Sequence, residues 1–109
     1  MEITIVDGKY ETQVLNGSIS VLNEFDGDAE IKQDLEGVID ISNSLDGEFG
    51  VFQKISDASA YTGRTNVIPS NEKQVLNTIG KVLGDNITIQ PIPSNYGKIT
   101  WNGVYLLVE

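Results

Sequence analysis

The sequence predicts an all-β protein, and three observations support this. Ile, Val and Thr, which favour strands, make up 30 of the 109 residues, whereas the helix formers Ala, Leu and Met make up 12. Apolar and polar residues alternate with a period of two through much of the first half. Dipeptides ending in Gly recur every ten residues there, a spacing typical of turns between short strands. The length fits a single domain, residues 1–109, that can bury one core.

The first element expected is a β-hairpin. Residues 3–6 and 10–12 are short strand-like runs on either side of Asp7-Gly8. Asp-Gly is among the preferred pairs for the two-residue turn of a hairpin, because both central residues of that turn need a positive φ. We therefore expect these two runs to pair antiparallel with each other.

Residues 13–55 form a decapeptide repeat. Its expected turns lie at Gly17, Gly27, Gly37 and Gly47, and an amide side chain occurs at every tenth position, at Gln13, Asn23, Gln33, Asn43 and Gln53. The amides, the repeated apolar residues and the glycines all fall on odd-numbered positions, so they share one face of an extended chain. We expect that face to be the core. The even positions carry most of the acidic residues and form a solvated face.

Two architectures fit the repeat. In the one we expect, strands of about eight residues joined by tight turns form an antiparallel β-meander or sandwich. The alternative is an interlaced oligomeric β-prism, in which equivalent residues stack and the amides form a hydrogen-bonded ladder. Ten extended residues reach only about 33 Å, too short to close a filled coil in one chain, so this version implies several chains, most naturally a homotrimer.

A small C-terminal β module is expected after the repeat. Residues 56–65 are rich in Ser, Ala, Thr and Gly and predict a loop between the repeat half, residues 1–55, and this module, residues 61–109.

Within the C-terminal module, residues 74–84 suit a short helix about as well as strands. Strand is favoured because Gly80 and Gly84 would interrupt a helix and because the strand-like run 87–89 follows. The last expected element is a second hairpin around Asn102-Gly103, with arms 99–101 and 104–108.

Composition excludes several function classes. The chain has no His and no Cys, so it contains no Ser-His-Asp or Cys-His nucleophilic site, no thiolate or imidazole metal site and no disulfide. Its net charge of −9 opposes binding to nucleic acid or to an anionic membrane. We expect no export signal, and no apolar run is long enough for a membrane helix. We also expect no cofactor.

Three groups of side chains are candidates for binding. Asp26, Asp28 and Glu30 could act as acid and base or bind Ca²⁺, but we interpret them as part of the solvated acidic face. The amide column could read sugar hydroxyls, although a role in fixing register is favoured. The aromatic residues of the C-terminal half could form a ligand or partner surface; they are Tyr61, Tyr96, Trp101 and Tyr105.

The C-terminal half carries a familiar pattern. The segments Tyr61-Thr62-Gly63, Gln74-Val75-Leu76-Asn77-Thr78 and Pro91-Ile92-Pro93-Ser94-Asn95-Tyr96-Gly97, followed by Trp101-Asn102-Gly103, resemble a module of small virion proteins in tailed phages and prophages of Gram-positive bacteria. The decapeptides ahead of it are similar to repeats that precede that module. The resemblance covers roughly residues 13–109 and departs from the pattern around Gly63-Arg64-Thr65.

The resemblance implies a non-enzymatic structural protein of the virion, in the tail or the head-to-tail region, assembled in the cytoplasm of the bacterial host. The partners it implies are other virion proteins, alongside self-association into a homo-oligomer. A host-adhesion module that binds cell-wall carbohydrate is the second hypothesis, and a β-rich hydrolase using the acidic residues is a distant third.

Overall fold

The strands of this protein pair in parallel, not antiparallel. The computed structural model describes residues 2–67, 74–89 and 100–108, with only the backbone for Val67 and for the last of these ranges. Every strand pair within those residues is parallel, and the chain winds into a β-solenoid of about four turns. The predicted antiparallel meander or sandwich is therefore wrong, although the all-β class is correct.

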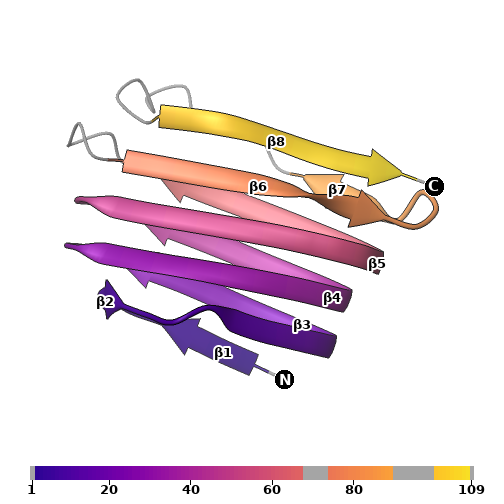
Figure 1. The fold of residues 1–109 in the computed structure, drawn as a ribbon, viewed down its shortest axis with the longest axis horizontal. Helices are drawn as coiled ribbons and strands as arrows, with labels where there is room; N and C mark the ends of the chain where they lie inside the picture. The colour runs from indigo at the N-terminus through magenta and orange to yellow at the C-terminus, as the bar shows by residue number, and fades with distance from the viewer. Residues whose placement is uncertain (1, 68–73, 90–99, 109) are drawn as a thin grey trace.

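Eight strands make up the described part of the solenoid (Figure 1). They are β1 (Glu2–Ile5), β2 (Gly8–Lys9), β3 (Gln13–Phe25), β4 (Ala29–Leu45), β5 (Phe49–Val67), β6 (Gln74–Val82), β7 (Ile87–Ile89) and β8 (Thr100–Val108). The main order across the sheet is β1-β3-β4-β5-β6-β8, with β2 beside β4 and β7 beside β5.

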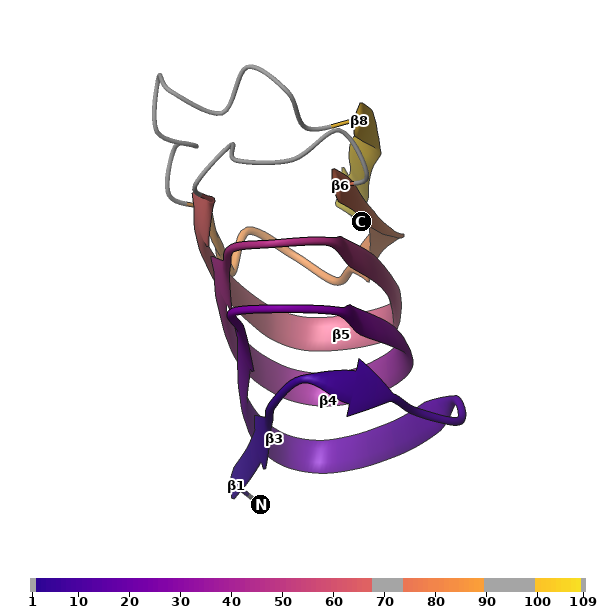
Figure 2. The same cartoon turned by 90° about the vertical axis from the view of Figure 1, so that its left-hand side faces the viewer.

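Each coil has two layers, because the long strands bend back on themselves (Figures 1 and 2). In β4, residues 29–36 run through one layer and residues 38–45 return through the other. We call the layer that faces the viewer in Figure 1 the front layer; it contains β2, residues 13–16, 29–36 and 49–56, β6 and β8. The back layer contains the remaining strand segments, which are β1, residues 18–25, 38–45 and 60–67, and β7.

One coil consists of two decapeptides, and this explains the error in the sequence-based topology. Gln13 pairs with Gln33, and Gln33 pairs with Gln53, so the structural period is twenty residues. Twenty residues close a flat two-layered coil within a single chain. The interlaced prism assumed one decapeptide per turn and therefore needed several chains; with two per turn that requirement disappears.

The predicted turn glycines occupy the two corners of the coil. Gly17 and Gly37 stack at one corner, inside β3 and β4, with φ of 93° and 108°. Gly27 and Gly47 lie at the opposite corner, in the breaks between successive long strands. A Cβ on Gly37 would overlap the backbone carbonyl O of Gly17 one coil below. Both the positive φ and the close backbone approach therefore require glycine at Gly37.

The two predicted hairpins are also wrong. β1 pairs with β3 and β2 pairs with β4, so the chain on either side of Asp7-Gly8 does not pair with itself. Asn102-Gly103 lies within β8, which runs beside β6 with a register shift at this point. A turn dipeptide indicates a change of direction or a bulge, but it does not choose the partner of the strand that follows.

The expected loop at residues 56–65 lies inside β5, so that prediction is wrong as well. The chain widens at a corner here: Glu36 pairs with Ser56 but Val38 pairs with Ala60, so two extra residues bulge out, with Asp57 at a φ of 49°. The preference for strand over helix in residues 74–84 is confirmed for most of that segment by β6.

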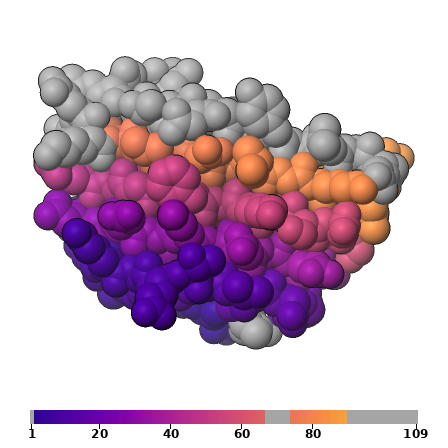
Figure 3. Space-filling model, viewed as in Figure 1, coloured from indigo at the N-terminus to yellow at the C-terminus, as the bar shows by residue number. Residues whose placement is uncertain are grey.

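The core lies between the two layers. Within the described residues it forms two apolar clusters, one towards each corner, built mainly from the odd-numbered positions of the repeat and completed by residues outside it such as Ile5, Leu76 and Val82. Ile31, Ile41 and Val51 are fully buried. Successive coils appear as stacked bands of colour in Figure 3, which shows that each coil lies directly on its neighbours. The amide column runs through the core between the two apolar clusters.

Candidate functional site

The buried amides form a hydrogen-bonded ladder through three coils. Gln residues stack in the front layer and Asn residues in the back layer, and they meet across the interior. Asn23 Nδ2 donates to Gln33 Oε1 at 2.9 Å, and Gln33 Nε2 donates back to Asn23 Oδ1 at 3.0 Å. Asn23 Nδ2 also donates to Asn43 Oδ1 at 2.8 Å, and Gln53 Nε2 donates to the same oxygen at 3.0 Å. These bonds satisfy amides that are fully or almost fully buried.

Hydroxyl groups continue the ladder where the repeat ends. In the third coil Thr65 replaces Asn, and Asn43 Nδ2 donates to its Oγ1 at 3.4 Å. In the fourth coil Thr78 replaces Gln, and its Oγ1 donates to Gln53 Oε1 at 3.1 Å. At the other end, Gln13 is only half-buried and accepts one bond from Gln33 Nε2 at 3.2 Å. The ladder therefore fixes the register of the coils and leaves no inward space for a sugar.

Tyr61, one of the four predicted surface aromatics, is buried. Its side chain is 6% exposed and belongs to one of the two apolar clusters, so it is not available to a ligand. Gly63 is the next odd-numbered residue after Tyr61, and a Cβ added to it would lie 2.9 Å from Tyr61 Cε1. Gly63 replaces the Ile41 of the coil below and makes room for the ring. Burial raises the pKa of the Tyr61 phenol to about 12.

The other three predicted aromatics follow Tyr61 in the C-terminal half. Trp101 and Tyr105 lie in β8, where their backbones are in register with Leu76 and Ile79 of β6. Tyr96 lies outside the described residues.

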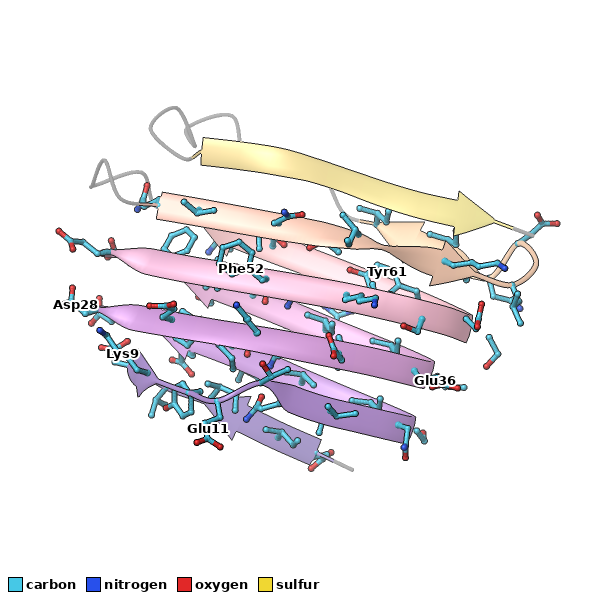
Figure 4. All side chains as sticks on the ribbon, in the orientation of Figure 1. Lys9, Glu11, Asp28, Glu36, Phe52 and Tyr61 are labelled. Atoms are coloured by element: carbon cyan, nitrogen blue, oxygen red, sulfur yellow. The ribbon has the colours of Figure 1, made fainter. Side chains whose placement is uncertain are left out.

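The front layer carries a half-buried aromatic residue on its outer face that the sequence analysis missed. Phe52 points outward from β5 in Figure 4, at an even position of the repeat. Its ring leans over Gly50: Phe52 Cε2 lies 3.6 Å from the point where a Cβ of residue 50 would be. The signal was present in the sequence, since an aromatic and a glycine stand at even positions where most other repeats carry polar residues.

The gap left by Gly50 opens a shallow hollow of about 350 Å³ beside Phe52. Its walls combine apolar, acidic and basic side chains, and it is lined by Lys9, Asp28, Ala29, Glu30, Glu48, Phe49, Gly50, Phe52 and Val75. On the other side of Phe52, a second hollow of about 280 Å³ includes Lys32, Lys54 and Asn77. Both are open depressions on the front layer, so they suit contact with an extended partner better than enclosure of a small molecule.

The acidic candidates do not converge. Asp26 lies in the corner between β3 and β4, Asp28 just before β4, and Glu30 on the outer face of the front layer. Within the described residues, no group of three or more carboxylates is close enough to hold a metal ion. The backbone N–H of Asp26 instead donates to Asp7 Oδ1 at 2.8 Å. This bond joins the turn after β1 to the turn after β3.

The back layer presents a mostly small and polar outer surface. Arg64 forms an ion pair with Asp40 one coil below, and its Nε donates to Ser42 Oγ at 3.1 Å. Such a surface-exposed pair adds little to stability on its own. It does connect adjacent coils from the outside, as the amide ladder connects them from the inside.

No helix among the described residues is long and apolar enough to cross a membrane.

Comparison with other proteins gives this chain no family. Searches against protein-family models, curated proteins and solved structures found no match for this chain.

Proposed function

We propose that this chain is a non-enzymatic structural protein of a phage virion, a tail or head-to-tail component that acts through protein-protein assembly. The observation that carries the proposal is the amide ladder, which crosses three coils and locks them in one register. A continuous ladder with a filled interior makes a stiff element with regular outer faces. The resemblance of the C-terminal half to small virion proteins is the reason for proposing a phage particle as the assembly in which this element acts.

The partners in this proposal are other virion proteins that contact the outer faces or the ends of the solenoid. The acidic surface, with a net charge of −9 for the chain, disfavours direct contact with packaged DNA. It also favours partners whose contact surface is basic or neutral.

The test is whether the protein belongs to the particle. Antibodies raised against the purified chain are applied to phage particles released from the induced source strain and purified by density gradient. We expect immunogold labelling at a fixed place on each particle and a constant ratio of this protein to the capsid protein across the gradient. Protein found only in the soluble fractions would contradict the proposal.

A host-adhesion role is the second candidate, and the hollow beside Phe52 is the observation that favours it. An aromatic ring flanked by Lys and Glu side chains offers stacking and hydrogen bonding to a sugar. Purified cell walls should then retain the wild-type chain and release Phe52→Ala, while Val38→Ala, on the back layer, serves as the control. Equal retention of both variants would remove Phe52 from any such role.

A further inference from the structure

The N-terminal end of the solenoid is stepped. β1 adds a strand below Ser20–Asn23 in the back layer. In the front layer, the outer edge of residues 13–16 has no strand partner among the described residues. Among the described residues, the front layer therefore stops half a coil before the back layer, and each layer leaves a strand edge open. Open edges are templates for pairing with another chain.

The open segment at residues 13–16 lacks the usual protection against pairing. It contains no charged side chain and no Pro. The residues that pair with this segment in the next coil, 33–36 of β4, include the charged Asp34 and Glu36. Natural proteins usually place charges or Pro on exposed edges. Here residues 13–16 are neutral, and Val14 is 71% exposed. The charged residues of this lowest coil lie outside that segment, among them Glu2 in β1, Lys9 in β2 and Glu11.

The step is complementary to a second copy of itself. Across the interior, Asn23 in the back layer faces the column of Gln13 and Gln33 in the front layer. β1 lies below Ser20–Asn23 in the back layer. It therefore stands opposite the empty place below residues 13–16 in the front layer. A two-fold rotation about an axis parallel to the strands exchanges the layers. It puts β1 of a second copy into the empty place, antiparallel to residues 13–16, and puts residues 13–16 of that copy below β1.

The side chains match in this arrangement. The partner's Ile5 comes below Gln13, the partner's Ile3 below Leu15, and the partner's Thr4 beside Val14. Ile3, Ile5 and Leu15 all point towards the interior, where Ile3 and Leu15 are only partly covered in a single chain. Thr4 and Val14 both point outward. Inward residues therefore meet inward residues, and the apolar core continues through the junction without a break.

We propose that this end is a dimerisation surface, and that two copies join through β1 and residues 13–16 into one continuous solenoid with a two-fold axis at its centre. Because the contact is isologous, it closes at two chains and leaves both C-terminal ends outward. The inference goes beyond the proposed function, since it holds whether or not the protein belongs to a virion.

The first test measures molar mass. The full chain is run on a sizing column with light scattering, at two loadings a hundredfold apart. We expect a mass of two chains at the higher loading. One chain at both loadings would overturn the proposal, as would three chains. A mass that keeps rising with concentration would also overturn it, because that behaviour indicates head-to-tail stacking.

Charge pairs at the junction identify the surface. Thr4 and Val14 lie on opposite layers of one chain but side by side across the proposed junction. The double variant Thr4→Lys with Val14→Lys sets like charges opposite each other twice and should weaken the dimer about tenfold or more relative to Thr4→Glu with Val14→Lys, which sets opposite charges there. Equal dimer affinities for the two variants would mean that the contact lies elsewhere.

Disulfide trapping gives an independent readout, because the chain has no native Cys. Directly opposed residues of antiparallel strands lie about 4.5 to 5.5 Å apart between Cα atoms, a distance that a disulfide bridges. The double variant Thr4→Cys with Val14→Cys should form a covalent dimer on mild oxidation, and each single variant should not. A double variant that stays monomeric on a non-reducing gel would overturn the proposal.

Discussion

The amide ladder should respond very differently to the same substitution at its centre and at its end. Gln33 is fully buried and donates two hydrogen bonds, to Gln13 and Asn23, at 3.2 and 3.0 Å. It accepts two more, from Asn23 and Gln53, at 2.9 and 3.2 Å. Gln33→Leu keeps the approximate volume and removes all four bonds. Asn23 Oδ1 then loses its donor inside the core.

The cost follows from those bonds. Each net hydrogen bond contributes about 0.5 to 1.5 kcal/mol, and an orphaned buried acceptor costs about 1 to 3 kcal/mol. The better burial of Leu offsets part of this loss, which leaves a destabilisation of about 2 to 4 kcal/mol. For a chain of this length that lowers the melting temperature by roughly 8 to 16 °C. Gln13→Leu loses one accepted bond at a half-buried site and should cost about 1 kcal/mol or less.

Urea unfolding followed by circular dichroism compares the two variants. The decisive quantity is the difference between Gln33→Leu and Gln13→Leu in the free energy of unfolding. If Gln33→Leu is as stable as Gln13→Leu, or more stable than the wild type, the ladder is a replaceable part of the core and does not hold the coils in register.

Three further predictions concern a corner, the core and the surface. Gly17→Ala should cost about 1 to 3 kcal/mol from backbone strain alone, and Gly37→Ala should cost clearly more, because its Cβ would also overlap the backbone of Gly17; urea midpoints that do not differ would contradict this. Because the folded state holds the Tyr61 proton up to a pKa of about 12, stability should be full below pH 10 and should fall between pH 10 and 12. Tyr61→Phe should remove that part of the fall, and identical alkaline melting curves for both proteins would refute it. Arg64→Ala should cost less than about 1 kcal/mol, and the loss should shrink in high salt, since its ion pair with Asp40 is partly exposed; a loss unaffected by salt would point to packing instead.

The sequence predicted which side chains are inside but not which strands pair. Alternation with a period of two identifies the inward face of an extended segment, whatever its neighbour is. A turn every ten residues is equally compatible with pairing to the next segment or to the one after it. The deciding signal was present in the amide column: Gln occupies positions 13, 33 and 53 and Asn occupies 23 and 43. This alternation marks a period of twenty and hence two different layers.

The aromatic site was harder to predict because it depends on the third coil. Tyr61 lies just after the two-residue widening of the corner at Asp57, and only the pairing of Ile39 with Tyr61 shows that the ring points into the core. Phe52 and Gly50 stand out once the layers are known, since both then fall on the outer face of the front layer. The burial of Tyr61 and the outward position of Phe52 both follow from the register of the strands, which the amino-acid composition does not encode.

The twenty-residue coil constrains how proteins of this kind change in length. Duplication of two decapeptides adds one coil of about 4.8 Å to the axis and leaves every column intact. Insertion or loss of a single decapeptide would make Asn stack on Gln within one layer in the coils that follow. It would also exchange the residues at the two corners of those coils. Growth should therefore proceed in whole coils, whereas small insertions collect at the corner around Asp57, where two extra residues already bulge outward without disturbing the ladder.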